Sequence, residues 1–296
     1  MVKEATYFAY RYFLIPNKQK PLFSESTSSS RERKEKLREI FKGLETGNRE
    51  HEIGEREYIL YLSAKFSDDL YLCKFAIEKS ITRHKPENED IEDIKEPDYP
   101  FIYFFVDLNH QLFLIEKNTT VMQKVEYTAK KIEKFMKKEV EKYDFSFKLE
   151  EITFEKRFWD FVEKSDGIFE LGLRLNSPNL FGGKLGTEEL LEDIHDSLNN
   201  TESEFGFINE EGNLSVKEED LEDFIKYITQ GGGQWKLDAE LEGNRKKVTS
   251  KASDNIKSFT LPRELEEQLS EGLKKQVKKE IEKIDDIIEE DGSHKK

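Results

Sequence analysis

The sequence predicts an α+β protein with mixed or antiparallel sheets, flanking helices, more than one domain and a long C-terminal helix. Paired aromatic and β-branched runs separated by short turns dominate the first half, which is typical of β-hairpins. Other segments carry apolar residues three or four positions apart, and this spacing predicts amphipathic helices. The 296 residues include 22 Phe and 11 Tyr, so a core can form although 35% of residues are hydrophobic and 38% are charged.

The N-terminal part predicts three strands and one helix. Residues 5–15 are aromatic and β-branched, so we expect a strand there. Residues 57–66 and 69–82 predict two more strands around a tight turn. The helix between them is indicated by apolar residues at helical spacing: Leu37, Ile40, Phe41 and Leu44.

A second set of strands and helices is predicted after residue 99. The runs that predict strands are 100–106, 111–116, 145–154 and 168–175, of which the first two form a hairpin. We expect Thr119 or Thr120 to cap a helix, and a shorter helix to span 155–163. The longer helix has one apolar stripe: Val121, Val125, Ile132 and Phe135.

The last third alternates helix and strand. Residues 187–198 and 217–228 predict helices, and three glycines at 231–233 separate the second of them from a strand at 234–241. We expect Pro262 to begin the last helix. Its apolar stripe covers about seven turns: Leu265, Leu269, Leu273, Val277, Ile281, Ile284 and Ile288. A charged helix with one apolar side requires a partner, which is either the body of the chain or a second copy.

These patterns predict four regions along the chain. An N-terminal α+β domain is expected over 1–85, followed by an acidic linker loop at 86–98. A second α+β domain is expected over 99–260, and the charged helix and tail over 261–296.

The net charge of −15 is unevenly distributed. Residues 187–223 contain 14 acids and one lysine (1 − 14 = −13), and residues 86–98 contain seven acids and one lysine (1 − 7 = −6). Two such blocks argue against an extended nucleic-acid surface and favour docking on a basic partner protein. The partner-binding candidates are Glu89, Asp90, Glu92, Asp93, Glu188, Glu189, Glu192, Asp193, Glu218 and Glu219.

The residue types needed for a cofactor or a zinc site are scarce. Cys73 is the only cysteine and lies in an apolar run, so we interpret it as a buried strand thiol. The five histidines are scattered singly, and the glycines at 182–183 lack the spacing of a phosphate loop. We therefore expect no cofactor, no metal and no catalytic residue. The single cysteine and the absence of a signal pattern or a long apolar run predict a cytoplasmic protein with no membrane contact.

Two alternative functions remain open from the sequence. A metal-dependent nuclease would use Asp238 and Glu240, which share one face of a predicted strand and precede a basic run. Asp107 with Glu116 and Lys117 fits a nuclease pattern less well, because Lys117 points to the opposite face. A nucleic-acid-binding module would use the lysine-rich face of the helix near 121–138: Lys124, Lys130, Lys131, Lys134 and Lys138.

Two segments resemble the C-terminal pattern of bacterial and prophage proteins linked to phage–host conflict. The first, 173–183, contains the turn Asn176-Ser177-Pro178-Asn179, and the second, 225–235, contains three consecutive glycines. The length and the Lys/Glu/Ile-rich composition are also similar to phage-encoded anti-Gabija inhibitors. The resemblance implies a self-associating protein of the host-cell cytoplasm that encloses a bacterial nuclease–helicase complex. Such a protein blocks the binding and cleavage of DNA by that complex, and the resemblance supplies no catalytic residue.

Overall fold

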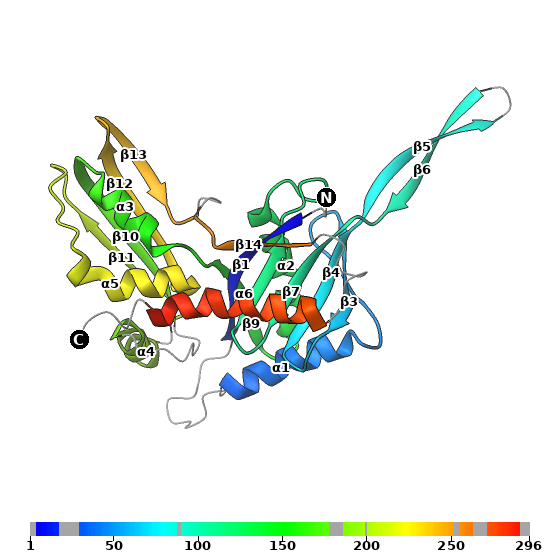
Figure 1. The fold of residues 1–296 in the computed structure, drawn as a ribbon, viewed down its shortest axis with the longest axis horizontal. Helices are drawn as coiled ribbons and strands as arrows, with labels where there is room; N and C mark the ends of the chain where they lie inside the picture. Colours follow the sequence, from blue (N-terminus) through cyan, green and yellow to red (C-terminus); the bar gives the residue numbers. More distant parts are fainter. Residues whose placement is uncertain are drawn as a thin grey trace.

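A large central sheet, a smaller sheet and a projecting hairpin make up the molecule (Figure 1). The computed structural model describes residues 4–17, 30–87, 90–177, 186–198, 200–251, 255–262 and 271–290. The small sheet lies at one end of the long axis and the hairpin projects from the other (Figure 1). The predicted α+β class, with antiparallel sheets and flanking helices, is confirmed.

The large sheet has eight antiparallel strands in the order β14-β1-β8-β7-β4-β3-β2, with β9 also paired to β1. Their bounds are β1 Glu4–Pro16, β2 Arg49–Glu52, β3 Glu57–Lys65, β4 Leu70–Ile77, β7 Phe101–Asp107, β8 Leu112–Glu116, β9 Phe145–Glu151 and β14 Ser258–Pro262. The hairpin predicted at 100–106 and 111–116 is confirmed as β7–β8. Strands from both sides of the predicted linker at 86–98 thus belong to one sheet.

Strand β1 is central because it contacts both cores of the large sheet. Its even-numbered residues from Phe8 to Leu14 belong to one cluster, and Ala5, Tyr7 and Ala9 belong to the cluster on the opposite face. Successive strand side chains point to opposite faces, so a strand buried on both faces reads as a continuous apolar run. This explains the aromatic sequence of residues 5–15.

Helices α1 (Ser30–Gly43) and α2 (Val125–Glu141) cover one face of the large sheet. The predicted stripe of α1 is buried, with Leu37 and Phe41 both at 0% exposure. The predicted cap of α2 is wrong: the helix begins at Val125 after Lys124, and Val121 is buried in the turn that precedes it.

Helix α6 (Glu271–Glu290) covers the opposite face of the large sheet (Figure 1). Leu273, Val277, Ile281 and Ile284 pack on the cluster that contains Tyr7 and Phe105. The predicted start of this helix at Pro262 is wrong, because Pro262 ends strand β14 and pairs with Glu4. Leu265 and Leu269 lie outside the described residues. The apolar side of α6 is covered by its own chain.

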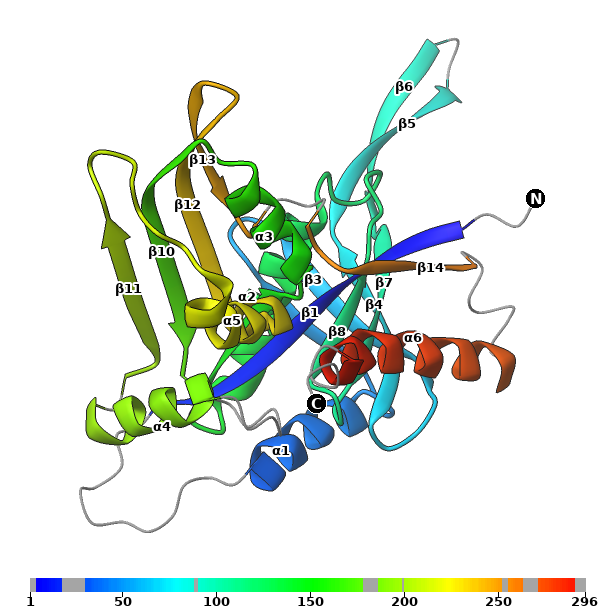
Figure 2. The ribbon, with the colours of Figure 1, turned by 60° about the vertical axis from the view of Figure 1, so that its left-hand side comes forward.

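The small sheet has the order β11-β10-β12-β13 and is antiparallel throughout. Its strands are β10 Gly167–Asn176, β11 Glu202–Ile208, β12 Gly233–Leu241 and β13 Asn244–Thr249. Helices α3 (Glu155–Glu163), α4 (Gly186–Leu198) and α5 (Glu218–Tyr227) contribute to its apolar cluster. Figure 2 shows α3 and α5 beside this sheet. From Glu170 onwards, the opposite face carries the even-numbered residues of β10 and β12, which are mostly polar.

The two sheets meet at the short helical turn Ile228–Gly232, which follows α5. Arg11 Nε donates to the carbonyl of Gln230 at 3.0 Å, and the Thr153 amide donates to the carbonyl of Thr229 at 2.8 Å. These bonds attach the small sheet to β1 and to the residues after β9. Among the described helices, none combines the length and the apolar character needed to cross a bilayer.

Candidate functional site

A hairpin with no buried residue among those described projects from the body of the molecule; it consists of β5 (Lys79–Glu87) and β6 (Asp90–Asp98), and we call it the arm. The sequence suggested an acidic loop at 86–98, and this expectation is wrong because β6 pairs with β5 from Lys79↔Asp98 to Glu87↔Asp90. The arm forms a two-stranded sheet of its own and contributes no residue to the apolar clusters of the described chain. Two-stranded hairpins alone are marginally stable in water, so an exposed arm of this length is suited to contact with a partner.

Ion pairs and one histidine–carboxylate hydrogen bond between the two strands stabilise the arm. Arg83 Nε lies 2.9 Å from Glu96 Oε2, and His84 Nδ1 lies 2.6 Å from Asp93 Oδ1. Lys85 Nζ lies 3.3 Å from the second oxygen of Glu96. These side chains are exposed or half-buried, so each pair contributes at most about 1 kcal/mol.

The charges of the arm are divided between its strands. Strand β5 carries three Lys/Arg and one Glu (3 − 1 = +2), with its histidine neutral. Strand β6 carries five acids and one lysine (1 − 5 = −4). The edge formed by β6 is therefore acidic although the arm as a whole is close to balanced.

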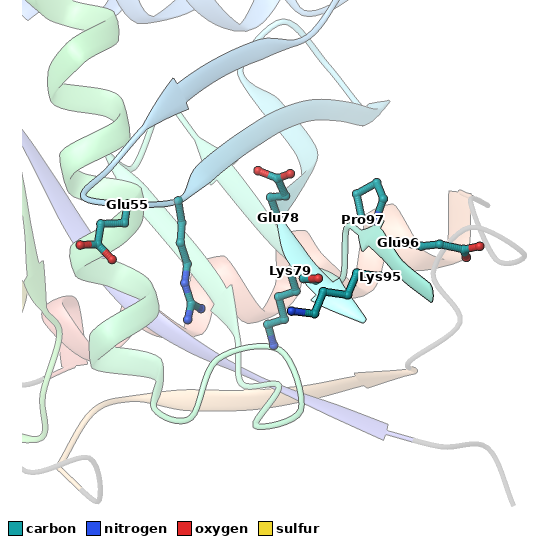
Figure 3. Close-up of a pocket in the computed structure, with 8 residues that line it drawn as sticks. Glu55, Glu78, Lys79, Lys95, Glu96 and Pro97 are labelled. Carbon is teal, nitrogen blue, oxygen red and sulfur yellow. The ribbon is translucent and has the colours of Figure 1, made fainter. Parts of the chain in front are cut away.

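A hollow of about 450 Å³ lies at the base of the arm, lined by Glu55, Arg56, Glu78, Lys79, Ser80, Lys95, Glu96 and Pro97. Figure 3 shows Lys79 and Lys95 extending to the same side, whereas Glu78 and Glu96 point away from them. Lys79 Nζ donates to the carbonyls of Thr120 and Val121 at 3.3 and 2.9 Å. Lys79 thus ties the arm to the turn before α2, and the hollow has a lining of mixed charge.

The structure separates the predicted partner-binding residues into two distant groups. Glu92 and Asp93 lie exposed on β6, and Asp90 belongs to the same strand. Glu192 and Asp193 are exposed on α4, and Glu218 and Glu219 are exposed in the first turn of α5, at the opposite end of the molecule (Figure 1). Glu188 and Glu189 also belong to α4. Glu89 lies outside the described residues.

The acids at the start of α5 have a structural explanation. Glu218, Glu219 and Asp220 occupy the first turn, where unpaired backbone N–H groups create a partial positive charge. Carboxylates there stabilise the helix without any partner. The arm is therefore the stronger candidate of the two acidic regions.

The two carboxylates proposed for a nuclease differ in burial and in their ion pairs. Asp238 is 2% exposed and accepts from Arg245 Nε and Nη2 at 2.9 and 3.2 Å, with Lys247 3.7 Å away. The hydrogen bond from Arg245 lowers the pKa of Asp238. Glu240 is half-buried one pleat further along β12. In the part of the chain that the structure describes, no three His, Cys, Asp or Glu side chains are grouped to hold a metal ion.

The other nuclease candidates also have local partners. Asp107 Oδ1 accepts from the amides of Asn109 and His110 at 2.7 and 3.0 Å, which shapes the turn between β7 and β8. Glu116 Oε2 accepts from the Tyr103 amide at 2.8 Å. These bonds use the carboxylates to hold backbone groups.

Part of the lysine-rich face of α2 is used within the fold. Lys138 Nζ donates to the carbonyl of Glu52 at 2.7 Å, and Lys131 Nζ lies 5.3 and 5.1 Å from the ring centres of Tyr58 and Tyr127. Lys124, Lys130 and Lys134 are exposed. Three exposed lysines on a helix are an ordinary solvated surface.

A polar network that was not predicted from the sequence lies between the sheets. Glu150 is 2% exposed and accepts from Gln234 Nε2 at 2.7 Å, while Lys148 Nζ and Arg174 Nη2 lie 3.0 and 3.4 Å from it. Lys148 also pairs with Glu202 of β11 at 2.8 Å. Alternation along 145–151 indicates that Lys148 and Glu150 share a face, but only the tertiary structure brings β10, β11 and β12 against that face.

A pH-sensitive carboxyl adjoins this network. Burial, followed by the negative charge of Glu150, raises the pKa of Glu151 to about 7, while Lys251 opposes the shift and Glu126 adds to it. The phenol of Tyr10, whose strand position pairs with Glu151, is buried beside it. In the unfolded chain the Glu151 carboxyl loses its proton near its ordinary pKa, whereas in the folded protein it keeps the proton until about pH 7. The stability of the folded state therefore falls as the pH rises towards and through 7.

We expect Glu151→Gln to increase stability at pH 8 by about 2 kcal/mol and to change it little at pH 5. The amide cannot ionise, so the cost of a buried negative charge disappears. Urea unfolding of both proteins at the two pH values measures this difference. Glu141→Gln, at an exposed position on α2, is the control and should behave as the wild type. An equal effect of Glu151→Gln at both pH values would contradict the prediction.

Comparison with known proteins does not identify the chain. No family model matches it, and no curated protein sequence matches it significantly. The resemblance to anti-Gabija inhibitors therefore stays a prediction. Within the fold, Asn176 and the glycines at 231–233 of the two quoted segments lie at the meeting of the sheets, where the Tyr227 hydroxyl donates to the Asn176 carbonyl at 2.7 Å.

Proposed function

We propose that this protein acts by binding a partner protein and carries out no chemical reaction. The observation that supports this is the arm, a pair of nine-residue strands that projects from the body and exposes an acidic edge. The arm joins none of the apolar clusters formed by the described residues. Ile91 on that edge is 65% exposed, which adds an apolar contact to the charge. Such an element costs conformational entropy to order and is stabilised when a partner covers it.

The chemistry of the arm favours a basic surface as its target. Glu92 and Asp93 attract cationic side chains over several ångströms, and this attraction accelerates encounter and selects the orientation of docking. A groove that binds DNA carries Lys and Arg towards the phosphates, so it offers the complementary charge. An acidic arm placed there excludes DNA by occupying the same cations.

The resemblance extends this proposal to a specific class of partner. We propose a phage counter-defence protein that binds and encloses a bacterial Gabija-type nuclease–helicase complex and blocks its DNA binding and cleavage. In this proposal the protein works in the host cytoplasm, self-associates, and contacts neither nucleic acid nor membrane directly. The two sequence segments at 173–183 and 225–235 and the acidic arm support it.

A reconstituted nuclease–helicase complex tests the function. The purified protein should co-elute with the complex and abolish its cleavage of a DNA substrate in proportion to the amount bound. Absence of co-elution at near-physiological salt would contradict this partner. Metal-dependent cleavage of DNA or RNA by the purified protein alone would contradict a binding function without catalysis.

We expect Glu92→Gln combined with Asp93→Asn to weaken partner binding about tenfold and to reduce its dependence on salt. The loss of two charges at a solvated interface accounts for a tenfold change in affinity. The matched control is Glu192→Gln with Asp193→Asn, which removes the same residue pair from α4 at the other end of the molecule. Titration calorimetry at two salt concentrations measures both. Equal weakening by the two variants would contradict a role for the arm.

A further inference from the structure

The two edge strands of the small sheet differ in their protection against pairing. Strand β13 presents three consecutive cations, Arg245, Lys246 and Lys247, and charged residues of this kind keep edges from joining. Strand β11 has no lysine and no proline, and it ends in Phe205, Gly206, Phe207 and Ile208. It lies at the outer end of the molecule (Figures 1 and 2).

The backbone of β11 has unpaired groups at regular intervals. The Asn209 amide donates to the Phe169 carbonyl at 2.9 Å, so the odd-numbered residues of β11 direct their backbone groups towards β10. Even-numbered residues direct theirs outwards. The carbonyl of Glu202 accepts from Asn200 Nδ2 at 3.0 Å. No bond among the described residues satisfies the outward groups of the remaining three: Glu204, Gly206 and Ile208.

The side chains of the second half of this strand, after the exposed Glu204, are apolar and accessible. Phe207 is 42% exposed and Ile208 is 73% exposed. Phe205 is half-buried and its ring contacts Phe224 of α5 edge-to-face at 6.0 Å between centres. A strand added to this edge would therefore extend both the hydrogen-bonded ladder and the apolar face that α5 covers.

We propose that β11 pairs antiparallel with β11 of a second copy, across a two-fold axis at Gly206. The three residues with free backbone groups are symmetric about Gly206, so Glu204 of each copy pairs with Ile208 of the other. Phe205 and Phe207 then lie opposite each other on the face that carries α5, where aromatic pairs across strands are stabilising. Between residues 204 and 208 no acid faces an acid, because Glu204 meets Ile208.

The sequence of β11 favours this partner over β13, the other edge of the small sheet. Pairing of β13 with its own copy would bring three cations against three cations. Pairing of β11 with β13 of another copy would leave one free edge on each molecule and would produce open chains. The two-fold β11 contact closes on itself. Because a single strand pair is smaller than the usual stable interface, we expect a dimer whose fraction rises with concentration.

This dimer would leave the arms free. Strand β11 and the arm lie at opposite ends of the long axis (Figure 1), so two arms would extend from the far ends of the pair. The inference specifies a surface for the self-association in the proposed function, but it is argued from β11 alone and does not depend on the arm. Loss of the β11 contact would leave arm binding by each monomer intact.

Disulfide formation across the axis tests the register directly. Paired residues in an antiparallel ladder have Cα atoms about 5.5 Å apart, which is within disulfide range. The native Cys73 is buried, so Gly206→Cys introduces the accessible thiol. We expect a covalent dimer on mild oxidation of Gly206→Cys and none for Gly47→Cys. Both glycines have no atom within 4 Å of an added Cβ, which makes the pair well matched.

Solution mass provides the second test. Sedimentation equilibrium should show a monomer–dimer equilibrium for the wild type and for Gly47→Lys, but a monomer for Gly206→Lys, which would place two lysines on the axis. The unfolding temperature of Gly206→Lys should equal that of the wild-type monomer, because a Cβ added at this position meets no atom within 4 Å. The proposal would be overturned if the wild type were monomeric at every concentration. It would be overturned equally if β11 of a monomeric wild type paired with a strand of another protein. A Gly206→Lys variant that still dimerises would overturn it as well.

Discussion

Replacing Gly233 with alanine should destabilise the protein by about 4 kcal/mol. An added Cβ would overlap the carbonyl oxygen of Arg174 and lie 3.0 Å from the Cα of Leu175. Both atoms belong to the backbone of β10, which is held by pairing with β11 and β12 and cannot move aside. The backbone of Gly233 is extended, with φ of 165°, so the cost comes from this overlap and not from its conformation.

Urea unfolding of Gly233→Ala measures the effect, and Gly172→Ala is the matched control. Gly172 lies in the same sheet on β10, but its added Cβ would meet nothing closer than Lys236 Cβ at 3.8 Å. We expect the control to change the free energy of unfolding by less than about 0.5 kcal/mol. Similar losses for both variants would show that glycine at 233 is not required by close packing.

The neighbouring glycines explain why three occur in succession. Gly231 has φ of +91°, and an added Cβ there would lie 2.5 Å from Arg11 Cβ. A Cβ on Gly232 would overlap the ring of Tyr227. The chain therefore passes between β1, β10 and α5 with no room for a side chain. The turn that contributes to the family resemblance is explained by the joining of the two sheets.

Local patterns predicted the elements that are stabilised by local contacts. The β7–β8 hairpin, α4 and α5 were found because alternation and helical spacing are visible over a few residues. Strand β6 was missed because six of its nine residues are acids or proline, a composition that is rare in strands. It is stabilised by β5, where Arg83 and Lys85 pair with Glu96 and His84 bonds to Asp93.

Contacts between distant residues were not predictable in the same way. Arg11 and Gln230 are 219 positions apart, and no periodicity relates them. Asp238 was proposed as a metal ligand from its position on a predicted strand. Its ion pair with Arg245 could not be seen from the sequence, because it forms only when β12 and β13 lie side by side. The acidic candidates were predicted by composition, but composition did not show that they lie at opposite ends of the molecule.

Replacing Val277 with aspartate should destabilise the protein by about 4 kcal/mol and cause it to aggregate. Val277 is fully buried between α6 and the large sheet, among the apolar side chains of that cluster. If α6 detaches, a face that includes Tyr7, Leu72, Phe105 and Leu114 is exposed to water. Contiguous apolar surfaces of this kind drive self-association.

The control for Val277→Asp is its neighbour, since Lys278→Asp introduces the same carboxylate on the exposed side of α6. We expect Lys278→Asp to unfold at the wild-type temperature and Val277→Asp to unfold at least about 8 °C lower and bind a hydrophobic dye. If the apolar side of α6 instead joined two copies, Val277→Asp would give a monomer with unchanged unfolding. The two results are distinct, because an intramolecular contact contributes to the stability of each chain at any concentration, whereas a contact between copies contributes only in the dimer.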